Sequence, residues 1–117
     1  MNENGNDKLI LAVLQGDDYA ETVAELNRNG FSATLLSSTG GFLKKKSTTV
    51  MIGVPREKLE DALAILKRCA GRRKRTIYRE VTVPHTGELS AMPLIPVDVE
   101  VGGAAVFVLD IQQMEKY

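Results

Sequence analysis

The residues best suited to chemistry lie between positions 37 and 49, in the run SSTGGFLKKKSTT. Two adjacent glycines allow backbone N–H groups to converge on one point, and hydroxyl groups with three lysines suit an anion such as phosphate. Phe42 adds a flat ring that can stack on a nucleotide base. The run is not a P-loop. The residue immediately before Lys46 is not a glycine, and a strand-like segment follows where a P-loop needs a helix. A polar hairpin loop with Phe42 packed inward is the alternative, and the residues alone leave both open.

Catalytic and metal-binding arrangements find little support in the sequence. The chain has one histidine, His85, and one cysteine, Cys69. His85 lies in a proline-rich segment without a supporting motif, so we expect an exposed loop residue rather than part of a catalytic triad. Cys69 falls on the apolar side of a predicted helix and is expected to be a small core residue. We therefore predict a protein that is not an enzyme, with no catalytic residue, no metal site and no cofactor.

Charge is unevenly distributed, although the net charge is zero. Residues 42–80 carry twelve basic and four acidic side chains, and the segments on either side are acidic. Cations concentrated in one segment favour an anionic ligand. Six of them lie in residues 67–75, either as cations that complement a helix C-terminus or as a phosphate-binding or nucleic-acid patch. We do not expect a nucleic-acid partner, because aromatic residues are scarce there and no nucleic-acid motif is present.

Hydrophobic periodicity predicts a βαββαβ order with an additional hairpin. Asp18 and Glu21 have the spacing of a capping box at the start of the first helix. The second helix starts near Pro55, and Val97, Val99 and Val101 alternate with acidic residues as in a half-buried strand. The predicted strands cover residues 8–15, 31–38, 48–54, 76–83, 97–101 and 104–109, with a long loop at 84–96. This order indicates a ferredoxin-like α+β sandwich, with a sheet on one side and two helices on the other.

Length and composition indicate one small globular domain. The chain has 117 residues, of which 44% are hydrophobic and 26% charged. We expect residues 1–7 to form a disordered leader and residues 8–117 to form the domain. No apolar run approaches the roughly 18 residues of a membrane-spanning helix, and the first residues lack the segments of a signal peptide. We therefore expect a cytoplasmic protein that does not bind membranes.

Three motifs follow one another along the chain. They are TGGFL at 39–43, a Thr-Thr pair at 48–49 and VEVGGA at 99–104. Together they resemble the cyclic di-AMP receptor family of PII-like signal proteins, and the resemblance extends over residues 9–117. It implies a homotrimer of PII-like subunits with nucleotide sites between neighbouring subunits. Two flexible loops, around 43–47 and 84–96, would change conformation when ligand binds.

The resemblance also implies which residues bind the ligand, cyclic di-AMP or a related nucleotide. Thr34 would hydrogen-bond the ligand, and Gly41 and Leu43 would offer backbone groups. Phe42 would lie against an adenine, and Gly53 would allow close approach of the ligand. The full candidate set is Thr34, Gly40, Gly41, Phe42, Leu43, Lys44, Lys46, Ser47, Thr48 and Gly53.

The chain departs from the family pattern at five positions. Ser32 stands where the family has an arginine, and Ser47 where it has an asparagine before the Thr-Thr pair. Gly30 replaces an asparagine, Lys46 a glycine and Lys116 a glutamine. Lysines can supply the positive charge of the missing arginine but not its planar fork. The alternative hypothesis is therefore a diverged PII-like protein that binds another anionic ligand or acts through a protein partner.

Overall fold

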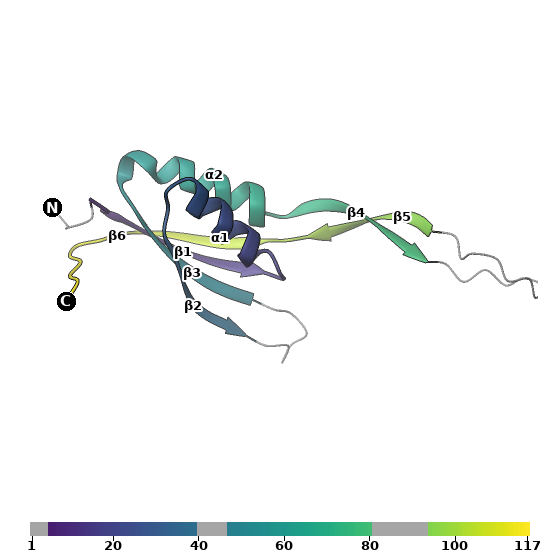
Figure 1. Cartoon of the computed structure of the whole chain (residues 1–117), viewed down its shortest axis with the longest axis horizontal. Helices are drawn as coiled ribbons and strands as arrows, with labels where there is room; N and C mark the ends of the chain where they lie inside the picture. The colour runs from purple at the N-terminus through teal and green to yellow at the C-terminus, as the bar shows by residue number, and fades with distance from the viewer. Residues whose placement is uncertain (1–4, 40–46, 81–93) are drawn as a thin grey trace, which may run out of the picture.

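The computed structural model describes residues 5–39, 47–80 and 94–117 (Figure 1). The predicted loop residues 43–46 and 84–93, including His85, lie outside these ranges. The helices are α1 (Tyr19–Arg28) and α2 (Leu59–Ala70), and a 3-10 turn, η2 (Arg56–Lys58), leads into α2. The strands are β1 (Lys8–Gln15), β2 (Ala33–Thr39), β3 (Ser47–Val54), β4 (Arg73–Glu80), β5 (Leu94–Val101) and β6 (Ala104–Asp110).

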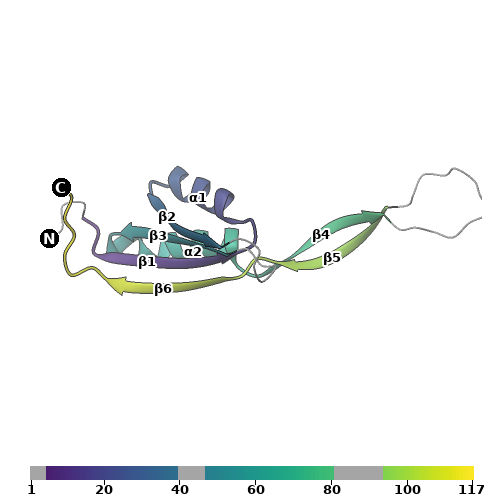
Figure 2. The ribbon, with the colours of Figure 1, turned by 90° about the horizontal axis from the view of Figure 1, so that it is seen from below.

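Four of the strands form one antiparallel sheet in the order β2-β3-β1-β6. Both helices lie on the same side of this sheet (Figure 1). This is the arrangement of a ferredoxin-like α+β sandwich, and the predicted fold class is confirmed. Among the strands that the structure describes, β4 and β5 pair only with each other, as a two-stranded ribbon inserted between α2 and β6. We call this ribbon the arm, and it projects from the body of the protein (Figure 2).

Alternation along β1 and β3 builds the core. Ile10 pairs with Ile52, and Ala12 pairs with Val50, and these four side chains are fully buried. Leu66 of α2 belongs to the same buried cluster. The apolar run of β1 on its own predicts a strand buried on both faces, whereas the structure fully buries only its helix-facing side. Cys69 packs against this core and is partly buried, in agreement with its predicted role.

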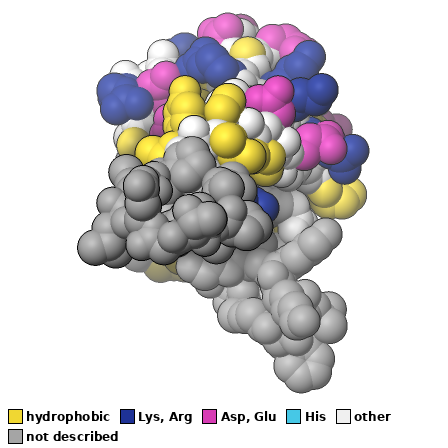
Figure 3. Space-filling model, turned by 90° about the vertical axis from the view of Figure 1, so that its right-hand side faces the viewer, with side chains coloured by type: hydrophobic (Ala, Val, Ile, Leu, Met, Phe, Trp, Pro, Cys, Tyr) yellow, Lys and Arg dark blue, Asp and Glu magenta, His cyan; other side chains and the backbone are white. Residues whose placement is uncertain are grey.

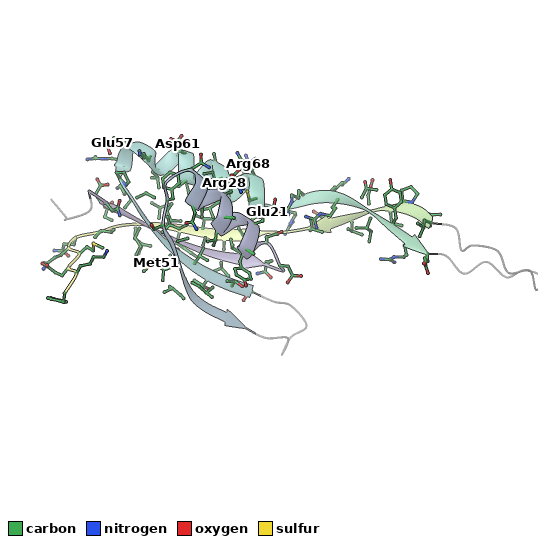
Figure 4. The ribbon with its side chains drawn as sticks, in the orientation of Figure 1. Glu21, Arg28, Met51, Glu57, Asp61 and Arg68 are labelled. Atoms are coloured by element: carbon green, nitrogen blue, oxygen red, sulfur yellow. The ribbon has the colours of Figure 1, made fainter. Side chains whose placement is uncertain are left out.

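The opposite face of the sheet is apolar at its centre, and no described element covers it. Leu11 lies between Met51 on β3 and Phe107 on β6, and Leu9 is the partner of Leu109. Met51 points to the side of the sheet away from α1 and α2 (Figure 4). Phe107 is 56% exposed and Leu109 44%. A contiguous apolar area of this kind on a single chain typically marks an interaction surface.

The start of α1 differs from the prediction. Asp18 occupies the N-cap position, but its side chain makes no capping hydrogen bond. Its carboxylate instead accepts a hydrogen bond from Arg73 Nη2 at 2.8 Å. The Arg73 guanidinium approaches both oxygens of this carboxylate, at 2.8 and 3.4 Å, and such a two-point contact is stronger than a single bond to a backbone N–H. The capping-box prediction was therefore wrong. The local spacing could not reveal the competing partner, because Arg73 lies 55 residues away in the sequence.

The arm begins and ends at residues other than those predicted. β4 starts at Arg73, three residues before the predicted strand, and β5 starts at Leu94, inside the predicted loop. Pro96 lies within β5, opposite Tyr78. Proline is tolerated there because β5 is an edge strand, where a missing N–H need not break a ladder.

Asp7 is part of the folded body, although the sequence places it in a leader. Its N–H donates to the Val54 carbonyl at 3.2 Å, and its carbonyl accepts from the Ile111 N–H at 3.0 Å. Its carboxylate accepts a hydrogen bond from the Arg56 N–H at 2.7 Å. Asp7 thus connects β3, η2 and the segment after β6. Within the described ranges, neither helix has the length and apolar character needed to cross a membrane.

Candidate functional site

A cleft of about 740 Å³ opens where β1 begins, β3 ends and the chain leaves β6. Its floor is apolar and comes from the uncovered face of the sheet, with Leu9 and Met51 as members. Thr34 stands beside Met51, its partner in the β2–β3 ladder. The segment after β6 supplies Gln113 and Lys116 to the opposite wall. The cleft therefore combines flat apolar surface with hydrogen-bonding groups.

The charges of the cleft are positive. Lys58 and Lys116 are the charged residues among its described lining, which contains no aspartate or glutamate. Both lysines are exposed, so their ammonium groups are free to move toward a ligand. Lys58 lies at the end of η2, and Lys116 lies in the segment after β6. Two cations from separate segments, in a described lining without carboxylates, favour an anionic ligand.

Gly53 provides close backbone approach at the end of β3. In this structure the side chain of Asn6 lies over it, and a Cβ on Gly53 would lie 3.1 Å from the Asn6 Nδ2 atom. Asn6 also lines the cleft. The space above Gly53 is thus shared by an amide side chain and the cleft, and a larger residue at position 53 would displace that amide.

A family model that describes the cyclic-di-AMP receptor matches residues 7–117. The chain belongs to the cyclic-di-AMP receptor family. A functionally unknown protein from Pediococcus pentosaceus ATCC 25745, known from a crystal structure, is 32% identical to this chain. That likeness covers 96% of this chain and 98% of that chain, with a TM-score of 0.70. Because the family is one of receptors, it indicates a binding or signalling protein rather than an enzyme. Within the described ranges there is no group of metal-ligating residues.

The cleft brings together two of the candidate residues predicted from the resemblance, Thr34 and Gly53. It also includes Ser32, Gly30 and Lys116, three of the positions at which this receptor departs from the family pattern. The cleft therefore gathers both positions that the resemblance predicts as ligand contacts and positions at which this chain departs from the family pattern.

Two further candidates, Ser47 and Thr48, are described and lie elsewhere. Ser47 and Thr48 are at the far end of β3, and neither lines the cleft. Thr48 pairs with Leu14 and is only 3% exposed, on the helix-covered face. The structure therefore does not place Thr48 among the residues of the cleft. The other six candidates lie outside the described residues: Gly40, Gly41, Phe42, Leu43, Lys44 and Lys46.

Sequence reasoning missed three polar residues of the cleft, Asn6, Lys58 and Gln113, as well as the apolar residues that line it. Asn6 falls in the predicted leader, and Lys58 belongs to a charged turn that resembles any solvated surface. Gln113 lies in a polar run after the last strand. No local pattern separates these residues from ordinary surface positions, and only the fold brings them together.

Three of the six cations in the basic run at residues 67–75 form ion pairs with described residues of the chain. Arg68 contacts Glu25 at 2.7 Å, Arg72 contacts Glu100 at 3.8 Å, and Arg73 contacts Asp18 at 2.8 Å. The Asp18 carboxylate, through its hydrogen bond, holds the pKa of the Arg73 guanidinium above its usual range. These pairs support the structural explanation of the run over a nucleic-acid patch.

A second hollow, of about 930 Å³, lies at the base of the arm. Arg72 and Arg75 line it together with Asp17, Asp18 and Glu100. Because carboxylates offset the arginines, this hollow has no preference for an anion. The cleft with Lys58 and Lys116 is therefore the candidate ligand site of the receptor.

Proposed function

We propose that the protein is a PII-like signalling receptor that binds cyclic di-AMP in the cleft described above. One observation carries the proposal: the family positions Thr34 and Gly53 lie in a cleft whose described charged residues are two lysines. The family match supports cyclic di-AMP as the first ligand to test. The cytoplasmic location expected from the sequence is part of this proposal.

The chemistry of the cleft suits a cyclic dinucleotide. Such a ligand has two phosphates, which need cations and N–H donors, and two adenines, which need flat apolar surfaces. Lys58 and Lys116 can each approach a phosphate as mobile point charges. Met51 and Leu9 offer apolar surface, and Gln113 offers an amide able to donate and accept hydrogen bonds.

Assembly into a homotrimer is the second part of the proposal. The uncovered face of the sheet, centred on Leu11 and Phe107, needs a partner surface to remove it from water. Leu9 and Met51 belong both to this face and to the cleft. A cleft at the border of an assembly face would lie between neighbouring subunits. The loops around 43–47 and 84–96 would then change conformation when ligand binds and signal to a protein target.

Calorimetric titration with cyclic di-AMP, with ATP and cyclic di-GMP as controls, tests the ligand. We expect one ligand per subunit, and size-exclusion chromatography with light scattering is expected to report a trimer. Lys58→Ala and Lys116→Ala should each weaken binding about tenfold, because each removes one charge-assisted contact. Lys67→Ala is the matched control, since Lys67 is exposed on α2 and does not line the cleft.

One observation favours a second candidate, a receptor diverged toward another anionic ligand. Ser32 lines the cleft at a position where the family has an arginine. The second candidate would be established if calorimetry detects binding of ATP or another nucleotide but not of cyclic di-AMP. Lys58→Ala should then weaken the binding of that nucleotide. Absence of binding for every nucleotide tested would overturn both.

A further inference from the structure

The two faces of the arm differ in chemistry. Because side chains alternate along a strand, residues paired across the ladder share a face. One face, which we call the arginine face, is formed by Arg73, Arg75, Ile77 and Arg79 opposite Val101, Val99, Val97 and Ile95. The other is formed by Lys74, Thr76, Tyr78 and Glu80 opposite Glu100, Asp98, Pro96 and Leu94. The arginine face thus carries no carboxylate, whereas the other face carries three.

The charges of the arginine face are not compensated at its outer part. Arg73, at the base of the arm, is bound to Asp18. Arg75 is exposed and borders the hollow that Asp17, Asp18 and Glu100 also line, so its charge is partly offset. Arg79, farther along β4, is exposed and forms no ion pair with any residue that the structure describes. On the other face, by contrast, Asp98 accepts a hydrogen bond from Thr76 at 2.8 Å. Hydrophobic and charged side chains are both visible on the surface seen from this end of the molecule (Figure 3).

The outer edge of β4 is open. β4 and β5 form a two-stranded sheet, so each has one edge without a strand beside it among the described residues. Pro96 lacks an N–H and makes β5 a poor template for a further strand. β4 contains neither proline nor glycine along its eight residues. β4 is therefore the edge better able to pair with another chain.

We propose that the outer edge of β4 binds an extended acidic segment of a partner protein as a third strand of the arm. Such pairing would place alternate residues of the segment opposite Arg75, Ile77 and Arg79. The matching sequence has an acidic, an apolar and an acidic residue at alternate positions. This pattern reads the same in both directions, so it holds for parallel and antiparallel addition.

The chemistry favours a protein segment over a nucleic acid. Single-stranded nucleic acids are held by aromatic stacking as well as by cations, and the arginine face has no aromatic residue. Tyr78 is on the other face. On the arginine face, β5 offers an apolar surface formed by Ile95, Val97, Val99 and Val101. The apolar residues of an added strand would enlarge this surface. The simpler alternative is that the arginines only protect the edge from aggregation.

Selection of a displayed library of random dodecapeptides on the full-length protein tests the proposal. We expect enriched peptides to show the alternating acidic, apolar, acidic pattern. Their affinity should fall at least tenfold for Arg75→Glu and for Arg79→Glu. Lys74→Glu is the matched control, because it makes the same charge change on the same strand but on the opposite face. Thermal unfolding of each variant checks that the fold is retained.

Hydrogen exchange distinguishes strand addition from simple charge attraction. Binding of an enriched peptide should slow exchange of the outward-pointing β4 amides, with no comparable change in β5. Enrichment of peptides without acidic residues, an equal loss with Lys74→Glu, or unchanged β4 exchange would overturn the proposal. The proposal would also be overturned if no peptide binds but single-stranded RNA does, and if Arg75→Glu abolishes that RNA binding. Failure to enrich any peptide would leave edge protection as the role of the arginines.

Discussion

The body and the arm use the same side-chain alternation with opposite results. In β1 and β3 every second residue over most of the strand is buried beneath the helices. In β4 and β5 no residue is buried, although β5 alternates valine and acid as regularly as any strand of the body. Alternation thus determines which side chains share a face. It does not determine whether another part of the chain covers that face.

The difference has an energetic meaning. A four-stranded sheet with two helices can remove a contiguous core from water, whereas a two-stranded ribbon is only marginally stable alone. The arm is therefore expected to depend on its base and on any partner that pairs with it. Local unfolding should begin in the arm and leave the body intact.

The largest expected effect contrasts one side chain from each region. Ile52→Ala should lower the free energy of unfolding by about 2–5 kcal/mol, because Ile52 is fully buried in the core. Val99→Ala, on the arginine face, should lower it by less than about 1 kcal/mol. Denaturant unfolding measures both. An equal cost at the two positions would show that the arm is covered in solution, as an assembly would cover it.

A smaller effect is expected at the junction between β5 and β6. Gly102 has a φ of +83°, and a Cβ there would overlap the Gly71 carbonyl oxygen and the Arg73 guanidinium. Gly102→Ala should cost about 2–4 kcal/mol, because backbone strain and steric overlap add.

Gly16→Ala provides the control for that substitution. Gly16 has a φ of +71° with open space around it, so it reports strain alone, about 1 kcal/mol. The free energies of unfolding of the two variants should therefore differ by the contribution of overlap. If the two substitutions lower the free energy of unfolding equally, the backbone at the junction can shift to avoid the overlap. The arm would then be connected to the body by a hinge rather than rigidly.

The smallest effect lies between the helices of the body. Glu25 accepts hydrogen bonds from Arg28 at 2.9 Å and from Arg68 at 2.7 Å, which links α1 to α2. The hydrogen bond from Arg28, aided by Arg68, lowers the pKa of the Glu25 carboxyl below its usual 4.5. The stabilisation is therefore complete above about pH 4.5 and is lost as the pH falls through the lower, folded-state value.

Melting temperatures of the wild type and Glu25→Gln measure this effect. The wild type should be slightly more stable at pH 7, and the gap should close toward pH 3. Because the pair is exposed, the difference at pH 7 should be well below the effect of Gly102→Ala. A gap that persists at pH 3 would show that packing, and not charge, holds the two helices together.

Much of the body could be predicted from the sequence because its signals are local. The apolar run at residues 8–15 indicated the first strand, and Gly30 and Gly71 indicated where the two helices end. The cleft was only partly accessible: the resemblance supplied Thr34 and Gly53, and local sequence offered no reason to join Lys58 to them. The same limitation explains Asp18, whose partner Arg73 is distant in sequence but adjacent in the fold.

The two ends of the arm meet at a single point. Arg73 is the ladder partner of Val101, and the Gly103 N–H donates to the Ala70 carbonyl at 2.8 Å. The chain therefore leaves the body and returns to it at the same place, as an insertion into the βαββαβ domain. A short turn could close that gap, so we expect that shortening or exchanging the arm would leave the fold of the body and the cleft at the other end of the sheet intact.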